Sequence, residues 1–250
     1  MNHYIDMQKQ NQIYDLFYSG KKLVALLIDP DKFNKSKIEK IFKKNICLPD
    51  LIFVGGSLLV EKQMEEVISF FKKNTKIPVV LFPGNSMQIS KNADAILFIS
   101  LISGRNPDFL IGQHVLSAPY IAKTQLEVIP TSYILIDGGV RTSVEYISQT
   151  APIPSDKTDI ALATALAGKY LGHKLIYLEA GSGAKNSVPT EMIKVISEKT
   201  NLPIIVGGGI RSEKMANHLL KAGASTIVIG NLFETNPDEA LKIIENIKTK

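Results

Sequence analysis

A carboxylate, a phenol and several glycines occur together in one stretch of the chain, Tyr177-Leu178-Glu179-Ala180-Gly181-Ser182-Gly183. Two more glycine-rich stretches, Gly207-Gly208-Gly209 and Gly230-Asn231, lie downstream, and each of the three stands where a short apolar run ends. Glycine lets a backbone approach a phosphate closely, and a helix that starts behind it favours negative charge. The three stretches therefore predict an anion site beside a single catalytic acid, Glu179.

Asp29 and Ser57 are candidate ligands for a cation, because they stand at the ends of the first two apolar runs. A hard cation such as Mg²⁺ takes one or two carboxylates together with oxygens of a substrate phosphate. On neighbouring strands, the two side chains could anchor Mg²⁺ for a substrate that carries a diphosphate. Capping of the following helix is the alternative role for Asp29.

The elements that must position these residues alternate between short β-branched runs and segments with helical spacing. Strands are predicted within residues 22–29, 51–57, 78–84, 95–100, 127–137, 175–178, 203–206 and 226–229, with Pro130 interrupting the fifth. Helices are predicted over residues 3–19, 34–44, 58–74, 107–124, 159–171, 189–199, 212–222 and 237–248. Residues 85–93 are too few and too polar for a full crossover helix, so the third one is expected to be reduced to a turn or loop.

Strands that alternate with helices run parallel, and their following loops open on the same edge. Eight such units predict a modified (β/α)8 barrel that forms a single domain over residues 1–250, with one crossover helix reduced. The alternative, an open doubly wound sheet, would place its phosphate loop after the first strand, where this chain has no glycine. The helix over 3–19 is expected to cover the bottom or the side of the barrel, and residues 138–157 to form a mobile loop.

Composition excludes several classes of protein. No apolar run among the 250 residues reaches the roughly 20 residues that a membrane span needs. The polar N-terminal segment does not resemble a signal peptide, and the single cysteine, Cys47, suits a reducing cytoplasm. The net charge of +5 comes without a basic stripe interleaved with aromatic residues, so no nucleic-acid partner is expected.

Four motifs resemble the geranylgeranylglyceryl phosphate synthase family over essentially the whole chain. They are Ile-Asp-Pro-Asp-Lys at 28–32, Tyr-Leu-Glu-Ala-Gly-Ser-Gly-Ala at 177–184, Val-Gly-Gly-Gly-Ile-Arg at 206–211 and Ile-Gly-Asn at 229–231. The resemblance implies an enzyme that joins sn-glycerol 1-phosphate to an all-trans prenyl diphosphate, most often geranylgeranyl diphosphate, through an ether bond. It also implies a homo-oligomer, either a dimer or a hexamer, with at most peripheral membrane contact.

The resemblance also implies roles for individual residues. Glycerol phosphate would be held by Tyr177, Leu178, Glu179, Ala180, Gly181, Ser182, Gly183, Gly208, Gly209, Gly230 and Asn231. Asp29 and Ser57 would hold Mg²⁺, and Glu179 would take the proton of the glycerol 3-hydroxyl. One departure stands at Leu27, where some bacterial relatives carry a lysine that would contact phosphate.

The isoprenoid tail needs an apolar groove, and its expected wall residues are Tyr120, Ile121, Ile129 and Tyr133. Core packing is the alternative role for these four side chains. Two other functions remain open on the sequence alone. A phosphosugar isomerase or cyclase barrel would use Asp29 and Asp137 as opposed acid and base and would not require Glu179. A regulator that binds a phosphate ligand without catalysis would share the glycine-rich loops.

Overall fold

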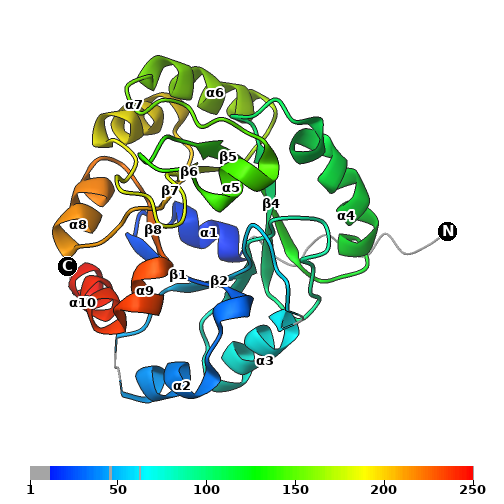
Figure 1. Cartoon of the computed structure of the whole chain (residues 1–250), viewed down its shortest axis with the longest axis vertical. Helices are drawn as coiled ribbons and strands as arrows, with labels where there is room; N and C mark the ends of the chain where they lie inside the picture. The colour runs from blue at the N-terminus through cyan, green and yellow to red at the C-terminus, as the bar shows by residue number, and fades with distance from the viewer. Residues whose placement is uncertain (1–11, 45–46, 62, 250) are drawn as a thin grey trace.

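The computed structural model describes residues 12–44, 47–61 and 63–249. Within them, eight parallel strands close into a barrel in the order of the chain (Figure 1). The strands are β1 (Leu23–Ile28), β2 (Leu51–Val54), β3 (Val79–Leu81), β4 (Ala95–Leu101), β5 (Glu127–Leu135), β6 (Leu175–Glu179), β7 (Ile204–Gly207) and β8 (Thr226–Ile229). The predicted barrel is therefore confirmed.

Helices surround the strands as an outer ring (Figure 1). The longer ones are α2 (Lys35–Lys44), α3 (Met64–Asn74), α4 (Gln113–Ile121), α6 (Thr158–Tyr170), α7 (Thr190–Thr200), α8 (Glu213–Lys221) and α10 (Pro237–Lys248). Shorter ones are α5 (Ser143–Ser148), α9 (Asn231–Thr235), a 3-10 helix η1 (Pro30–Lys32) and a π-helical turn η2 (Asp108–Gly112). Residues 82–94, between β3 and β4, contain no helix, as the sequence predicted.

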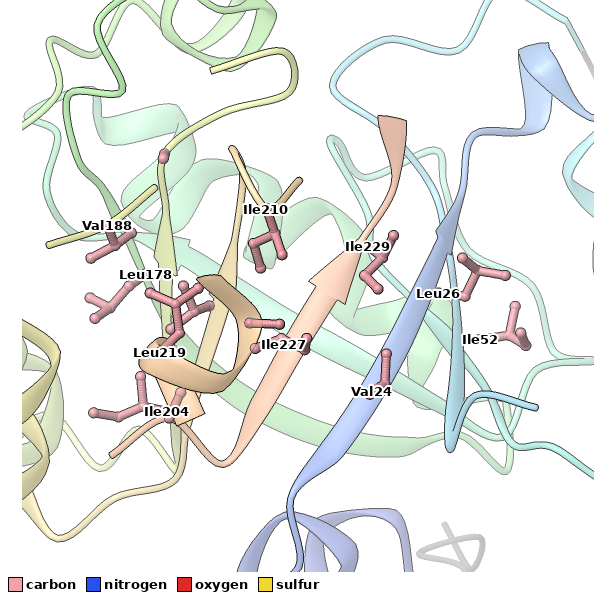
Figure 2. Close-up of a cluster of buried hydrophobic side chains, with 14 of the residues drawn as sticks. Val24, Leu26, Ile52, Leu178, Val188, Ile204, Ile210, Leu219, Ile227 and Ile229 are labelled. Atoms are coloured by element: carbon pink, nitrogen blue, oxygen red, sulfur yellow. The ribbon is translucent and has the colours of Figure 1, made fainter. Parts of the chain in front are cut away.

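Two hydrophobic clusters hold the barrel together, because successive side chains of a strand point to opposite faces. Outward-facing residues pack against the helices, and Figure 2 shows part of this layer, with Val24 of β1 and Ile227 of β8 in the same cluster as Leu219 of α8. Inward-facing residues of the same strands, such as Ala25 and Val228, fill the barrel interior. The interior is thus a packed core and leaves room for ligands only at its ends.

A short helix, α1 (Gln12–Tyr18), closes the N-terminal end of the barrel. Its buried residues Ile13 and Phe17 belong to the interior cluster. Glu127, the first residue of β5, accepts hydrogen bonds from the backbone N–H groups of Ile13 (2.9 Å) and Tyr14 (2.8 Å). The helix predicted over 3–19 therefore covers the bottom of the barrel, although its residues 3–11 lie outside the described residues.

The predicted start of the helix over residues 58–74, at Leu58, is wrong, because α3 begins only at Met64. The Asp31 carboxylate accepts hydrogen bonds from the backbone N–H groups of Val60 (2.7 Å) and Glu61 (3.0 Å). These N–H groups are bonded to a side chain 29 and 30 residues away, which keeps this stretch in a loop beside η1.

Pro130 does not interrupt the fifth strand, in contrast to the prediction. It pairs with Phe98 of β4, and its carbonyl accepts a hydrogen bond from the N–H of Lys174. A strand residue directs its N–H and C=O to the same side, so the N–H that proline lacks would face the chain just before β6 starts at Leu175. The strand ends at Leu135, and residues 138–157 carry α5; their mobility stays a prediction.

Glu127→Ala is expected to lower the free energy of unfolding by about 1–3 kcal/mol, because it removes the acceptor of two N–H groups at the start of α1. Urea unfolding followed by circular dichroism would measure the change. Glu127→Gln is the matched control, since it keeps one acceptor oxygen and should lose less. Equal stability of the alanine variant and the wild type would contradict this role.

Candidate active site

A cavity of about 550 Å³ opens at the carboxyl ends of the strands. Most of the predicted site residues line it, namely Asp29, Ser57, Tyr177, Glu179, Ser182, Gly183, Gly208, Gly209, Gly230 and Asn231. Leu178, Ala180 and Gly181 are not among the lining residues. Leu178 and Ala180 point outward into the cluster beneath the helices, so only their backbone could serve a ligand on the inside.

Glu179 is the last residue of β6, and its side chain is only 6% exposed. One carboxylate oxygen, Oε1, accepts a hydrogen bond of 2.6 Å from the backbone N–H of Gly181. Burial raises the pKa of Glu179 to about 7, and the Gly181 N–H and the Tyr177 hydroxyl lower it only in part. A carboxylate of this pKa can accept a proton near neutral pH.

Tyr177 and Glu179 point to the same side of β6, as the alternation of side chains predicted. The Tyr177 hydroxyl is buried and makes no hydrogen bond of good geometry with the described residues. It nevertheless lies near the carboxylate, since a Cβ on Gly207 would be 2.5 Å from this hydroxyl and 2.7 Å from Glu179 Oε2. Burial and then the charge of Glu179 raise the pKa of the phenol. The two groups are therefore in contact without a well-aligned hydrogen bond.

Gly208 leaves the space that the buried carboxylate needs. Its φ of +83° suits glycine, and a Cβ there would lie 2.6 Å from both Glu179 Oε1 and the Gly181 nitrogen. The loop after β7 thus lies against the loop after β6. Across the mouth, the Ser182 hydroxyl donates a 2.8 Å hydrogen bond to Asn231 Oδ1, which joins the β6 loop to the start of α9.

Three aromatic rings form an apolar floor beneath Glu179. The centroid of Tyr177 lies 5.1 Å from that of Phe82 and 5.2 Å from that of Tyr133, and all three residues line the cavity. Aromatic faces exclude water and carry partial negative charge, so they suit a positively polarised hydrocarbon group.

Asp29 caps the following helix, the alternative that the sequence left open, and its role as a Mg²⁺ ligand stays a prediction. Its Oδ1 accepts a 3.1 Å hydrogen bond from the N–H of Asp31 and so caps η1, while the carboxylate also lines the cavity. Its Oδ2 lies 3.6 Å from the Lys32 ammonium, which is 3.0 Å from Glu234 of α9. The described residues hold no cluster of three or more His, Cys, Asp or Glu side chains around a common point.

Sequence reasoning missed several residues that line the cavity, among them Lys32, Phe82 and Arg211. Arg211 donates a 2.7 Å hydrogen bond to the carbonyl of Ala184. Lys32 and Arg211 both belong to motifs that carry other site residues, and this position in the sequence could have identified them. Asp137, in contrast, does not line the cavity, and its carboxylate accepts the N–H of Gly139 in its own loop.

An apolar cleft continues from the main cavity between β3, β4, β5 and α5. It shares Gly56, Ser57, Phe82, Tyr133 and Val144 with the cavity, and it is further lined by Pro83, Gly84, Ile99, Leu101, Phe109, Ile147 and Ser148. Of the four expected wall residues, only Tyr133 borders it. Tyr120 lies on the exposed surface of α4, whereas Ile121 and Ile129 are buried in the two core clusters.

Residues 19–248 match the model of the PcrB family. The chain belongs to the PcrB family. Geranylgeranylglyceryl phosphate synthase of Spirosoma linguale is 49% identical over 90% of either chain, and that of Korarchaeum cryptofilum is 42% identical over 90% of this chain and 93% of its own. These PcrB-family relatives confirm the resemblance seen in the motifs.

A solved structure gives the same assignment for the fold. The Thermoplasma acidophilum (S)-3-O-geranylgeranylglyceryl phosphate synthase, in complex with its substrate sn-glycerol-1-phosphate, superposes with a TM-score of 0.87. It is 35% identical in sequence, and the match covers 94% of this PcrB-family chain and 98% of the other.

Glu179→Gln is expected to stabilise the folded protein above neutral pH. The pKa of about 7 lies above the 4.5 of an ordinary glutamate. Between these pH values the unfolded chain releases the Glu179 proton while the folded protein keeps it, so stability falls as the pH rises, by about 3 kcal/mol at about 1.4 kcal/mol per pKa unit. Urea unfolding should show a larger gain for the variant at pH 8 than at pH 5. An equal gain at both pH values would contradict the raised pKa.

Proposed function

We propose that this chain is a prenyltransferase that joins the 3-hydroxyl of sn-glycerol 1-phosphate to an all-trans prenyl diphosphate, with geranylgeranyl diphosphate as the preferred donor. The observation that carries the proposal is a buried carboxylate, Glu179, between a cradle of glycine-rich loops and an apolar cleft. The names of the relatives, and the glycerol phosphate bound to the Thermoplasma acidophilum enzyme, support it.

Glycerol phosphate would lie over the loops after β6, β7 and β8. It would be surrounded by backbone N–H groups, since small residues expose the backbone there. These groups belong to residues 177–183, Gly208, Gly209, Gly230 and Asn231. Leu27 packs against Gly230, with its Cβ 3.6 Å from the position a Cβ would take on that glycine. No lysine is available at position 27, and Arg211 would supply the positive charge for the glycerol phosphate.

Glu179 would act as the general base. It would remove the proton from the 3-hydroxyl while that oxygen attacks C1 of the prenyl group and the bond from C1 to diphosphate breaks. The buried setting favours transfer of this proton, because a carboxylate with a pKa of about 7 is a stronger base than an exposed one.

Asp29 and Ser57 would hold Mg²⁺ with the diphosphate. Their donor set, one carboxylate and one hydroxyl lining one cavity, suits a cation that takes its remaining ligands from phosphate oxygens and water. Mg²⁺ would neutralise charge on the leaving diphosphate. Lys32, which pairs with Asp29, would then remain paired with Glu234 and close to the same phosphates.

The first units of the prenyl tail would enter the apolar cleft between β3, β4, β5 and α5, which has a volume of about 60 Å³. Phe82 and Tyr133 lie where the cleft meets the main cavity, so their rings would face C1 and the first isoprene units. Each buried carbon of the tail would contribute about 0.8 kcal/mol.

We further propose a homo-oligomer, a dimer or a hexamer, that acts in the cytoplasm without a nucleic-acid partner and with at most peripheral membrane contact. Exposed apolar side chains around α4, namely Ile111, Val115, Leu116 and Tyr120, support a protein contact there. Among the described helices, none is long and apolar enough to cross a bilayer. Light scattering of the purified protein would measure the oligomeric state, and a monomer at micromolar concentration would contradict this part.

The decisive experiment incubates the purified protein with Mg²⁺, radiolabelled sn-glycerol 1-phosphate and prenyl diphosphates of several lengths. Label that becomes extractable into organic solvent is expected, most strongly with geranylgeranyl diphosphate. Folded protein that binds glycerol phosphate but transfers no prenyl group from any donor would contradict the proposal.

Glu179→Gln is expected to lower kcat by about 10²- to 10⁴-fold, the usual contribution of a general base. For the wild type, kcat/KM should rise with pH through about 7 as Glu179 loses its proton. Steady-state rates between pH 5.5 and 8.5 would test both. Glu198→Gln, on the exposed face of α7, is the control. An unchanged pH profile in the Glu179 variant would assign the base to another group.

Gly208→Ala is expected to raise KM for sn-glycerol 1-phosphate by about tenfold or more, because the added Cβ displaces the Glu179 carboxylate and the Gly181 backbone. Gly172→Ala is the matched control. Gly172 has a similar φ of +88° but nothing within 4 Å of an added Cβ, so it should cost stability without changing KM. Similar kinetic constants for both variants would show that backbone strain alone explains the effect.

A further inference from the structure

The irregular segment between β3 and β4 contains one buried side chain, Gln88, that reaches two loops of the active site. Gln88 is 4% exposed. Its Oε1 accepts hydrogen bonds from the backbone N–H groups of Gly84 (3.1 Å) and Gly56 (3.3 Å), and its Nε2 donates to the carbonyl of Gly56 at 2.8 Å. One carboxamide thus satisfies both backbone groups of Gly56 and joins that residue to the loop after β3.

The two joined loops are in direct backbone contact. A Cβ on Gly84 would overlap the carbonyl oxygen of Gly56 and would lie 2.9 Å from the Cα of Ser57. On its other side, Gly56 lies near Asp29, whose Oδ1 would be 3.9 Å from a Cβ at that position. The Gly56–Ser57 segment is therefore held between Asp29 and Gly84, and the hydrogen bonds of Gln88 fix its position between them.

Among the described residues, the side-chain hydrogen bonds of Gln88 reach only one half of the mouth. Its three side-chain partners belong to the loops after β2 and β3, whereas the glycine-rich loops follow β6, β7 and β8. Gly56 and Ser57 line both the main cavity and the apolar cleft, and Gly84 lines the cleft. A change at Gln88 would thus reach the prenyl diphosphate side of the site and leave the glycerol phosphate side intact.

We propose that Gln88 is a positioning residue for the prenyl diphosphate, which fixes the Gly56–Ser57 segment opposite Asp29 in place of the absent crossover helix. This inference rests on the proposed function. Without the carboxamide, three half-buried backbone groups lose their partner, and they regain one only if the loops move apart and admit water.

The test compares Gln88→Met, which keeps the length of the side chain but none of its hydrogen bonds, with the wild type. KM for geranylgeranyl diphosphate is expected to rise about tenfold, while KM for sn-glycerol 1-phosphate should stay within about twofold. Asn92→Ala is the matched control, because Asn92 lies in the same segment but bonds to Glu65 of α3. It should leave both constants unchanged.

A second measurement does not depend on turnover. Hydrogen exchange followed by NMR should show faster exchange of the Gly56 and Gly84 amides in Gln88→Met, with the Gly181 amide unchanged. If Gln88→Met does not fold, Gln88→Glu serves instead, because a carboxylate oxygen would then face the Gly56 carbonyl and repel the loop away from the oxygen that accepts the Gly56 N–H. It should raise KM for the prenyl donor and speed exchange at Gly56 in the same direction.

The outcomes separate this inference from the proposed function. Transfer by the wild type, together with equal rises in both KM values or unchanged exchange at Gly56, would overturn the role of Gln88 and leave the function standing. A different result would be faster exchange at Gly56 and Gly84 in Gln88→Met together with no prenyl transfer by the wild type. That result would overturn the function and retain the structural role of Gln88.

Discussion

The burial of one carboxylate, Glu179, is the constraint on which the rest of the mouth depends. An ionised carboxylate removed from water is costly unless hydrogen bonds compensate it. Here the Gly181 N–H supplies one bond, and it does so only because the chain turns sharply after β6. The loop after β7 must then pass within a few ångströms of the same oxygen, which Gly208 permits. The glycines that suit a phosphate are thus also required by the acid.

The same burial links stability to chemistry. Desolvation is the largest cause of the raised pKa of Glu179, and the contacts with Gly181 and Tyr177 offset only part of it. A more stabilised carboxylate would be a weaker base, so the incomplete compensation is useful at neutral pH. The aromatic floor of Phe82, Tyr133 and Tyr177 maintains this state because it leaves the carboxylate few polar neighbours.

Much of this arrangement could be predicted from the sequence, because parallel strands bring their carboxyl ends to one edge. Apolar runs that end in Glu179, Gly208 and Gly230 are enough to place those residues together. Contacts between distant loops could not be predicted in the same way. The late start of α3 depends on Asp31, and the cleft walls depend on the curvature of the barrel, so local pattern could not separate Tyr133 from Ile129.

One barrel mouth can serve two chemically different ligands because its two halves differ in polarity. Its polar half, from β6 to β8, carries glycine loops with backbone donors, whereas the half from β3 to β5 is apolar. A full helix after β3 would pack on outward-facing residues of β4 such as Ile96 and Phe98, as helices do elsewhere in the ring. The cleft is lined instead by the inward-facing Ile99 and Leu101. The segment that replaces the helix must still fix the loops after β2 and β3. Gln88 does so through hydrogen bonds in place of helix packing, and the apolar surface stays free for a hydrocarbon chain.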